Sequence, residues 1–376
     1  MGRVQHVMTA CELRTPTSAH PGPVIVSARR AVLDVLHNPR VYSSASGSRL
    51  APRRPLAPVN LDPPLHTAWR TALDPLFAPA RINSLCPTIT RVAADLIEGF
   101  ADADEIDFAA QFSVPFPTQV LMVLLGLPLE DLPWLTDLTQ GVVQPHRAIG
   151  KPRDDAEALD YQGVMSDWAY DYFQEAIDKR AQQPADDVLT ELLAIKVDGT
   201  CADSDQLLEV CFTLLTEGVA PMSAALDCVF ALLAEHRELR QQVIANPRRA
   251  LEELLRWVTP VSFVSRTATT DTVLQGCPIR AGQRVVARLS DANSDPTEFE
   301  DAGTLRPCRE VNRHMAFGAG IHRCLGSHLA RAQILVALQE WHRRIPEYSV
   351  ERPSELAFAR RVRTVDRFPM RLSDAR

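Results

Sequence analysis

The sequence predicts a mainly α-helical protein with a small β region, on three observations. Apolar residues recur with helical spacing over most of the chain, and the segment 204–236 is apolar on all sides, as is typical of a helix through the middle of a domain. Residues 261–288 are rich in Val, Thr and Ser, with turn signals at Gly276 and Gly282, which indicates short antiparallel strands. No stretch resembles a linker, so we expect a single domain over residues 1–376.

Local signals set the limits of the helices. Asn38-Pro39 ends the first helix and Asn246-Pro247 opens a later one, because proline is tolerated at the start of a helix but not inside it. Residues 44–61, rich in Ser, Pro and Arg, and residues 291–313 are expected to be irregular. The expected helices cover 29–36, a segment from about 64, then 82–101, 117–126, 155–182, 186–195 and 204–236, and segments that begin near 247 and 324.

Composition narrows the functional classes. A formal net charge of −7 gives no support to general nucleic-acid binding. The apolar run Val120–Leu127 is too short to span a bilayer, and residues 1–16 lack the apolar core of an export signal. The eight cysteines occur singly, without a CxxC pair, which favours reduced thiols. We therefore expect a cytoplasmic protein that binds neither nucleic acid nor membrane.

The most specific motif is the decapeptide Phe317-Gly318-Ala319-Gly320-Ile321-His322-Arg323-Cys324-Leu325-Gly326. Its glycines permit a tight turn, and the start of a helix near Cys324 favours the thiolate over the thiol. A thiolate suits a haem iron, and Phe317 and Leu325 would keep that side apolar. Two alternatives stay open, a buried structural cysteine and a zinc site. The zinc ligands would be His314, His322, Cys324 and His328, whose spacing matches no closed four-ligand pattern.

This decapeptide resembles the haem-binding signature of the cytochrome P450 family at every defined position. The resemblance implies the cytochrome P450 fold, in which haem b lies between the I helix, here 204–236, and the L helix, here beginning near Cys324. It implies that Cys324 is the axial ligand of the iron, in a cofactor-binding loop that includes Phe317, Gly318 and Gly326. It also implies an oxidoreductase that uses molecular oxygen, with hydrogen peroxide as an alternative. Electrons would come from a separate ferredoxin and ferredoxin reductase, as in the soluble bacterial members, and Arg323 and Arg331 are candidate contacts for the ferredoxin.

Glu253 and Arg256 form an ExxR pair, 68 residues or so before the cysteine. A spacing of three places both side chains on one helical face. The pair resembles the structural element of the family's K helix, which fixes the loop before the cysteine together with a further arginine. Arg309 is the candidate for that third residue.

His66 and Arg70 are separated by one helical turn, so both can point at one anionic group. The segment resembles the family's C helix, in which these residues hold a haem propionate. Arg266 and His322 match two further propionate partners, and charge-assisted hydrogen bonds would anchor the carboxylates. The alternative for His66 and Arg70 is an exposed helix face.

The I-helix segment departs from the family pattern. Gly218 is retained, but Ala220 and Pro221 replace the acid and the alcohol, and neither side chain carries a proton. Pro221 also lacks the N–H that would bond to the Glu217 carbonyl, so we expect a kink there. The residues of this oxygen groove are Gly218, Val219, Ala220 and Pro221. Glu217, Thr216 or Ser223 are candidate replacements for the proton relay, unless Glu217 points away from the haem.

Three reactions tolerate this change: one in which the substrate supplies protons, one that uses peroxide, and oxidative coupling. Peroxide-using relatives place an arginine before the proline, so Ala220 argues against them. We expect a haem-thiolate oxidase or monooxygenase of bacterial natural-product biosynthesis, with coupling (C–C, C–N or C–O) of an aromatic or peptide-derived small molecule. The alternatives are hydroxylation or epoxidation of a terpene or polyketide scaffold, and a non-catalytic haem-binding protein. The expected substrate pocket is formed by Val219, Met222, Val261, Phe263 and Val264.

Overall fold

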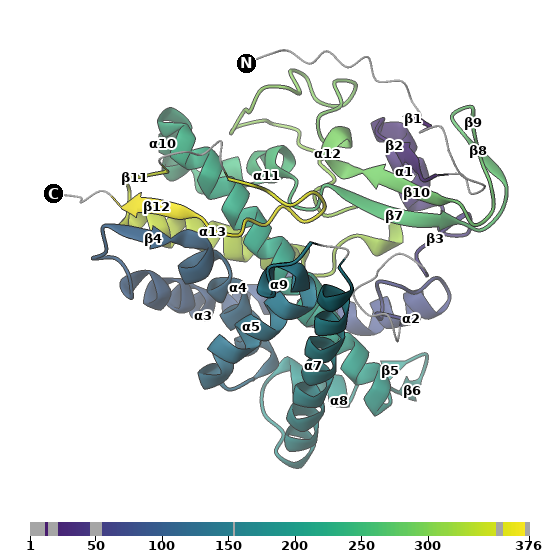
Figure 1. The fold of residues 1–376 in the computed structure, drawn as a ribbon, viewed down its shortest axis with the longest axis horizontal. Helices are drawn as coiled ribbons and strands as arrows, with labels where there is room; N and C mark the ends of the chain where they lie inside the picture. The colour runs from purple at the N-terminus through teal and green to yellow at the C-terminus, as the bar shows by residue number, and fades with distance from the viewer. Residues whose placement is uncertain (1–11, 14–21, 46–54, 153–154, 351–355, 373–376) are drawn as a thin grey trace.

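The computed structural model describes residues 12–13, 22–45, 55–152, 155–350 and 356–372, so half of the loop expected at 44–61, residues 46–54, lies outside the described residues. Figure 1 shows a large helical part and a smaller part rich in strands, with α9 running between them. The helices are α1 (Arg29–His37), α2 (Leu65–Leu73), α3 (Pro79–Glu98), α4 (Pro115–Leu125), α5 (Leu132–Val143), α6 (Pro145–Ala148), α7 (Ala156–Gln182), α8 (Val188–Leu193), α9 (Ser204–Glu235), α10 (Arg237–Ala245), α11 (Pro247–Val258), α12 (Leu289–Ala292) and α13 (Ser327–Arg344), with single turns η1 (Asp74–Phe77), η2 (Ala109–Ser113), η3 (Leu129–Asp131) and η4 (Gly320–His322).

The strands are short. They are β1 (Glu12–Leu13), β2 (Val24–Val26), β3 (Tyr42–Ser43), β4 (Glu105–Asp107), β5 (Lys196–Val197), β6 (Thr200–Cys201), β7 (Phe263–Ala268), β8 (Thr272–Leu274), β9 (Cys277–Ile279), β10 (Arg284–Arg288), β11 (Tyr348–Ser349) and β12 (Pro369–Leu372). The prediction of a mainly α fold with a small β region is therefore confirmed. The expected helices are also confirmed to within a few residues, whereas α5, α6, α10 and α12 were not predicted.

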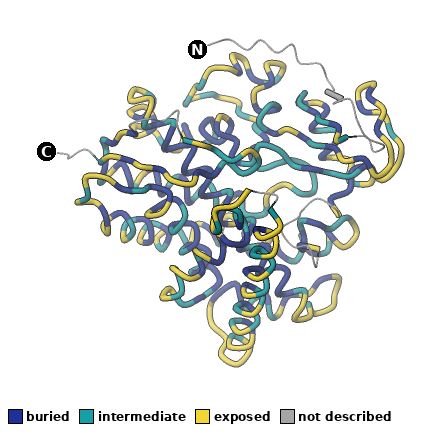
Figure 2. The backbone as a smooth tube through the Cα atoms, in the orientation of Figure 1, coloured by how far each residue is buried: buried dark blue, intermediate teal, exposed yellow. Residues whose placement is uncertain are grey.

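Helix α9 is the central element, and its sequence explains both its start and its position. The Asp203 side chain accepts a hydrogen bond from the Gln206 backbone, and the Gln206 side chain accepts one from the Asp203 backbone, which forms a capping box. The helix continues for 32 residues through Pro221, so the proline does not break it. By length and composition α9 resembles a membrane span, but 72% of its most apolar window is buried inside the molecule. In Figure 2, buried segments in dark blue run through the middle of the fold.

The main sheet has five strands in the order β1-β2-β10-β7-β3. Strand β10 pairs antiparallel with β7, with Val285 opposite Arg266, which confirms the antiparallel strands expected at 261–288. On its other side β10 pairs parallel with β2, with Val285 opposite Val24, so the sheet as a whole is mixed. Three residues of β2 are too few for a periodic signal, which is why sequence reasoning missed this partner.

The cysteines differ from the expectation of eight reduced thiols. Cys277 in β9 is disulfide-bonded. The cysteines with free thiols are Cys86, Cys201, Cys211, Cys228, Cys308 and Cys324. Single cysteines far apart in the sequence hold no signal for such a bond, because only the fold brings them together.

Candidate functional site

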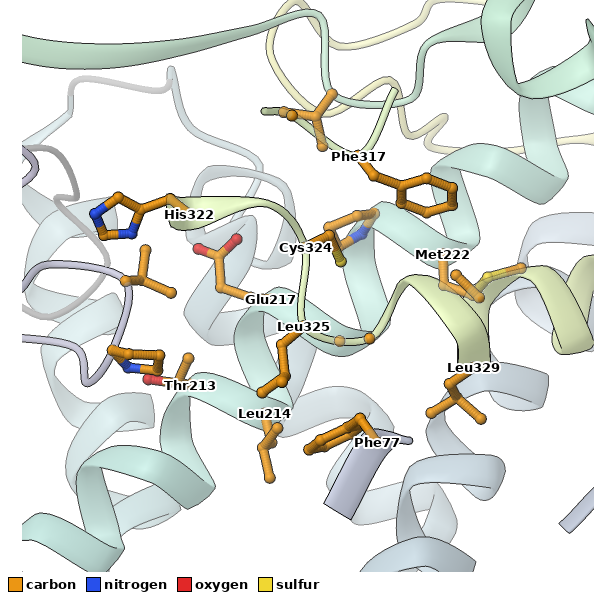
Figure 3. Close-up of a pocket in the computed structure, with 18 of the residues that line it drawn as sticks. Phe77, Thr213, Leu214, Glu217, Met222, Phe317, His322, Cys324, Leu325 and Leu329 are labelled. Atoms are coloured by element: carbon orange, nitrogen blue, oxygen red, sulfur yellow. The ribbon is translucent and has the colours of Figure 1, made fainter. Parts of the chain in front are cut away.

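Cys324 lines a cavity that opens between α9 and the loop before α13. Figure 3 shows Cys324 with Phe317 and Leu325 beside it, and Glu217 and Met222 on the neighbouring α9. The cavity measures about 320 Å³, which lies in the range of small-molecule sites. The chain thus brings the sequence-predicted cysteine and part of the predicted groove to one place.

Glycines give the cysteine loop its shape. Gly318 and Gly320 have φ angles of 70° and 69°, in the left-handed region that favours glycine. A Cβ atom on Gly320 would lie 2.0 Å from the carbonyl oxygen of Leu36, so the close approach of α1 also requires glycine. The backbone N–H of Cys324 donates to the Phe317 carbonyl at 2.9 Å, which closes the loop just before α13 begins at Ser327.

The thiol of Cys324 is accessible from the cavity but surrounded by protein in other directions. Burial raises the pKa of this thiol, and a hydrogen bond from the Gly326 backbone only partly offsets the rise. The surrounding protein groups alone therefore do not provide the expected preference for the thiolate, because burial of the thiol outweighs the charges of Arg70 and Arg323. A coordinated metal deprotonates a thiol directly, so a thiolate here depends on metal coordination.

The alternative zinc site is contradicted. Nε2 of His314 lies 2.8 Å from Oε2 of Glu252, so this ring is already engaged. Among the described residues, no group of three or more His, Cys, Asp or Glu side chains is arranged to hold a metal ion. Cys324 is therefore a candidate ligand without further protein ligands beside it among the described residues. A single protein ligand is the arrangement expected of an axial haem ligand.

His66, Arg266 and His322 form a cluster of nitrogen donors, of which Arg266 donates to the Ser265 carbonyl at 2.8 Å. The rings of His66 on α2 and His322 in η4 lie 4.1 Å apart, and both nitrogens of His66 and Nε2 of His322 are buried without a hydrogen-bond partner. Burial, followed by the charge of Arg266, lowers the pKa of His322 to about 3. Burial also lowers the pKa of Arg266 to about 10. Buried polar groups are normally paired, so these orphaned donors fit the carboxylates of a haem.

Arg70 lies at the edge of this cluster and lines the same cavity. Its Nη1 donates to the Arg323 carbonyl at 2.7 Å, and its Nη2 lies 2.9 Å from Oδ1 of Asp74. Arg70 therefore connects α2 directly to the cysteine loop. The alternative of a simple exposed helix face is wrong, since His66 is buried and both residues line the cavity.

Glu253, Arg256 and Arg309 lie in contact. Arg256 donates to both carboxylate oxygens of Glu253 at 2.8 Å, and Nε of Arg309 donates to the same carboxylate at 3.0 Å. Asn312, which sequence reasoning missed, adds a bond of 2.9 Å. Arg256 also donates to the carbonyls of Asn293 and Ala302, so the cluster fixes the irregular segment that precedes the cysteine loop.

Helix α9 presents one stripe to the cavity. The residues of this stripe are Val210, Thr213, Leu214, Glu217, Gly218, Pro221, Met222 and Ala225. Their spacing of three or four is that of one helical face. Figure 3 shows the carboxylate of Glu217 directed into the cavity, so the alternative in which it points away is wrong.

Several expected groove residues lie off this stripe. Val219 and Ala220 are buried and are not among the described residues that line the cavity. Thr216 and Ser223 are buried and donate to backbone carbonyls of their own helix, at 2.9 and 3.2 Å, so they are wrong as cavity relays. Thr213 lines the cavity instead, and its position one turn before Glu217 was the signal that sequence reasoning overlooked.

Three residues of the predicted substrate pocket, Met222, Val261 and Val264, line the cavity, whereas Val219 and Phe263 do not. Neighbouring side chains of a strand point to opposite faces, which separates Phe263 from Val264. Arg361 also lines the cavity and was not predicted. It is nearly a hundred residues away in the sequence from β7, the strand beside which it lies.

The two arginines expected to meet a ferredoxin differ. Arg331 binds Glu252 through Nε and Nη2 at 2.7 and 2.8 Å, and its guanidinium lies 4.4 Å from the centre of the Phe317 ring. Arg331 is thus engaged within the chain. Arg323 is exposed and stays a candidate for a partner contact.

Comparisons with known proteins agree with this geometry. The family model "Cytochrome P450" matches residues 248–344, which include the Glu253 cluster and Cys324. The chain is 31% identical to the "Steroid C26-monooxygenase" of Mycolicibacterium smegmatis, over 87% of this chain and 81% of the relative. It is 31% identical to "Cytochrome P450 109" of Bacillus spizizenii, over 81% of this chain and 74% of the relative. Its fold matches "The structure of the Bottromycin biosynthetic protein SalCYP" with a TM-score of 0.79 and 26% identity, over 93% of this chain and 86% of the other. The chain therefore belongs to the cytochrome P450 family and is a haem b oxidoreductase of the monooxygenase type.

Proposed function

We propose that this chain forms a C–C, C–N or C–O bond within an aromatic or peptide-derived natural product. The substrate loses two hydrogen atoms, and dioxygen takes these, together with two electrons from a ferredoxin and two protons, to become two molecules of water. The observation that carries the proposal is the cavity stripe of α9, which has Pro221 where an alcohol is usual and Glu217 as its single acid. No oxygen atom enters the product.

Residues around the cavity have distinct tasks in this proposal. Cys324 ligates the haem iron, and His66, Arg266 and His322 bind the haem carboxylates, with Arg70 tying α2 to the loop. The Glu253 cluster holds the segment before Cys324 in place. When bound, the haem supplies the one-electron and dioxygen chemistry, while the protein supplies orientation and proton control.

Proton supply is the reason that coupling is favoured. Pro221 has neither a hydroxyl nor an N–H, and Ala220 has no side chain that can carry a proton. Glu217 is the acid that the stripe offers, one turn before Pro221. Two protons still have to reach dioxygen in coupling, and O–H or N–H groups of the bound substrate would relay them where the cavity wall is poor in donors.

Regioselective hydroxylation is the second candidate. It is favoured by the named activity of the steroid C26-monooxygenase, a relative that matches most of this chain. The likeness to a bottromycin biosynthetic protein supports a role in natural-product biosynthesis under either reaction. We further propose that the chain acts as a single domain in the cytoplasm, with a ferredoxin and its reductase as electron donors.

Labelled dioxygen distinguishes the two reactions. The haem-loaded protein is given a ferredoxin system, ¹⁸O₂ and a panel of aromatic peptides, cyclic dipeptides and steroids, and products are weighed by mass spectrometry. Coupling gives products two mass units lighter than the substrate without label. A product that carries one ¹⁸O atom would replace the coupling proposal with hydroxylation.

A further inference from the structure

The charged residues of the cavity fall into two groups. His66, Arg70, Arg266 and His322 gather on one side, where the haem carboxylates account for them. Outside that cluster, the described residues of the cavity lining include one acid, Glu217, and one further base, Arg361. Glu217 is therefore the acidic side chain that a substrate in this cavity would contact. This inference rests on the proposed function, because it assumes that the substrate binds in this cavity.

Glu217 has no partner for its carboxylate within the described part of the chain. No hydrogen bond or ion pair joins it to another described residue, although it lies close enough to Cys324 for its charge to raise the pKa of that thiol. The backbone carbonyl of Arg361 accepts from the Ser262 backbone at 2.8 Å beside the Val261–Val362 bridge, and among the described residues no ion pair joins the Arg361 guanidinium to Glu217. Figure 3 shows the Glu217 carboxylate directed into the cavity.

Most neighbours of Glu217 along the cavity stripe are apolar. They are Leu214, Gly218, Pro221 and Met222, with Thr213 as the polar neighbour one turn before Glu217, and Val264 lies on the strand side of the cavity. A ligand that fills such a space removes water from the carboxylate. Burying an unpaired charge is costly, whereas a ligand of opposite charge compensates it. The cavity therefore discriminates against neutral ligands and in favour of cations.

We propose that the substrate carries a cationic nitrogen, such as an amine, and that Glu217 binds this group as a specificity-determining residue. The position of Glu217 one turn before Pro221 places the charged end of the substrate against α9 and leaves the remainder beside Met222 and Val264. Within the natural-product class already proposed, this selects amine-bearing molecules over uncharged terpenes, steroids and polyketides.

Binding of matched ligands tests the assignment. The probes are indolyl, phenyl and naphthyl ethylamines, each as its trimethylammonium derivative and as its neutral N-acetyl derivative. Neither form has a free amine that could ligate the iron. Dissociation constants are measured by equilibrium dialysis on haem-loaded protein without electron donor, for the wild type, Glu217→Gln, Glu217→Asp and Glu235→Gln. Glu235 is an exposed acid at the far end of the same helix and controls for overall charge.

The expected result is that at least one scaffold binds more tightly as the cation than as the neutral form. Glu217→Gln should remove ~10- to 100-fold of the cation affinity, the size of a close interaction between two opposite charges, while Glu217→Asp retains a preference and Glu235→Gln changes nothing. The absence of a cation preference on every scaffold, or its survival in Glu217→Gln, overturns the assignment. Neither outcome depends on turnover, so an error in the proposed reaction would leave this result unchanged.

Discussion

Arg256 binds both carboxylate oxygens of Glu253, with Nε–Oε2 and Nη2–Oε1 distances of 2.8 Å, and neither side chain is exposed to solvent. Glu253 accepts three more hydrogen bonds from residues that precede the cysteine loop: the Arg306 backbone, the Arg309 guanidinium and the Asn312 amide. One buried carboxylate therefore connects α11 to the segment that leads to Cys324.

Glu253→Gln should destabilise the protein by about 3–5 kcal/mol, because it leaves buried Arg256 without its countercharge. Denaturant unfolding of the haem-loaded protein measures the change. Glu300→Gln, at an acid that is 86% exposed, is the control and should change little. Equal midpoints for the two variants would show that the cluster contributes nothing to stability.

Asp227 gives the stability a pH dependence. Burial raises the pKa of Asp227 to about 7, partly offset by the hydrogen bond from Ser113. The pKa of Asp227 is higher in the folded than in the unfolded protein, so the protonated carboxyl contributes to the free energy of unfolding. This contribution is complete below about pH 4, decreases as the pH rises, and is lost above about pH 7. The change amounts to roughly 4 kcal/mol at most.

Asp227→Asn should abolish this decline. Unfolding free energies of the two proteins are compared between pH 4 and pH 8, with Asp95→Asn at an exposed position of α3 as the control. The difference in unfolding free energy between the wild type and Asp227→Asn should change with pH. The corresponding difference for Asp95→Asn should not depend on pH. A pH-independent difference for Asp227→Asn would mean that this carboxyl is ionised in the fold throughout.

Arg266→Met should weaken haem retention by ~10- to 100-fold, since it removes a buried donor from the cluster beside His322. Transfer of haem to excess apomyoglobin provides the rate of loss. Arg280→Met, at an exposed residue after β9, serves as the control. Identical rates in the two variants would exclude Arg266 from haem binding.

Pro221→Thr should place a hydroxyl in the cavity. With a simple aliphatic ligand bound, a larger share of the electrons should then appear in an oxygenated product, and a smaller share in hydrogen peroxide. We expect an increase of ~10-fold or more, below the ~10²–10⁴ of a fully positioned acid. Pro87→Thr replaces the proline inside α3, outside the cavity, and controls for loss of a helical proline. An unchanged peroxide yield in Pro221→Thr would remove proton supply as the reason for coupling.

The sequence predicted those parts of the site that depend on residues close together in the chain. The glycines around Cys324, the three-residue separation of Glu253 and Arg256, and the four-residue separation of His66 and Arg70 are all local, and the structure brings each set together. Arg309 was found because the resemblance called for an arginine in that segment.

Contacts between segments that are distant in the sequence could not be predicted from the sequence pattern. Arg361 reaches the cavity through pairing with residues beside Val261, and Asn312 reaches Glu253 from an irregular segment, so no periodicity predicts either. The rotation of α9 was also misjudged: the family motif drew attention to Val219 and Ala220, whereas the helical stripe runs through Thr213, Glu217 and Pro221. Which face of a fully apolar helix meets the cavity depends on packing, which the sequence pattern does not encode.

The measurement that most directly tests the haem-thiolate site is the carbon monoxide spectrum of the reduced protein, compared between Cys324→Ser and Cys308→Ser. Cys308 is an exposed free thiol upstream of the same loop and provides the control. Wild type and Cys308→Ser should both show the red-shifted carbonyl band that a thiolate ligand produces, and Cys324→Ser should lack it. A thiolate-type band that persists in Cys324→Ser would contradict the assignment of this cysteine as the iron ligand.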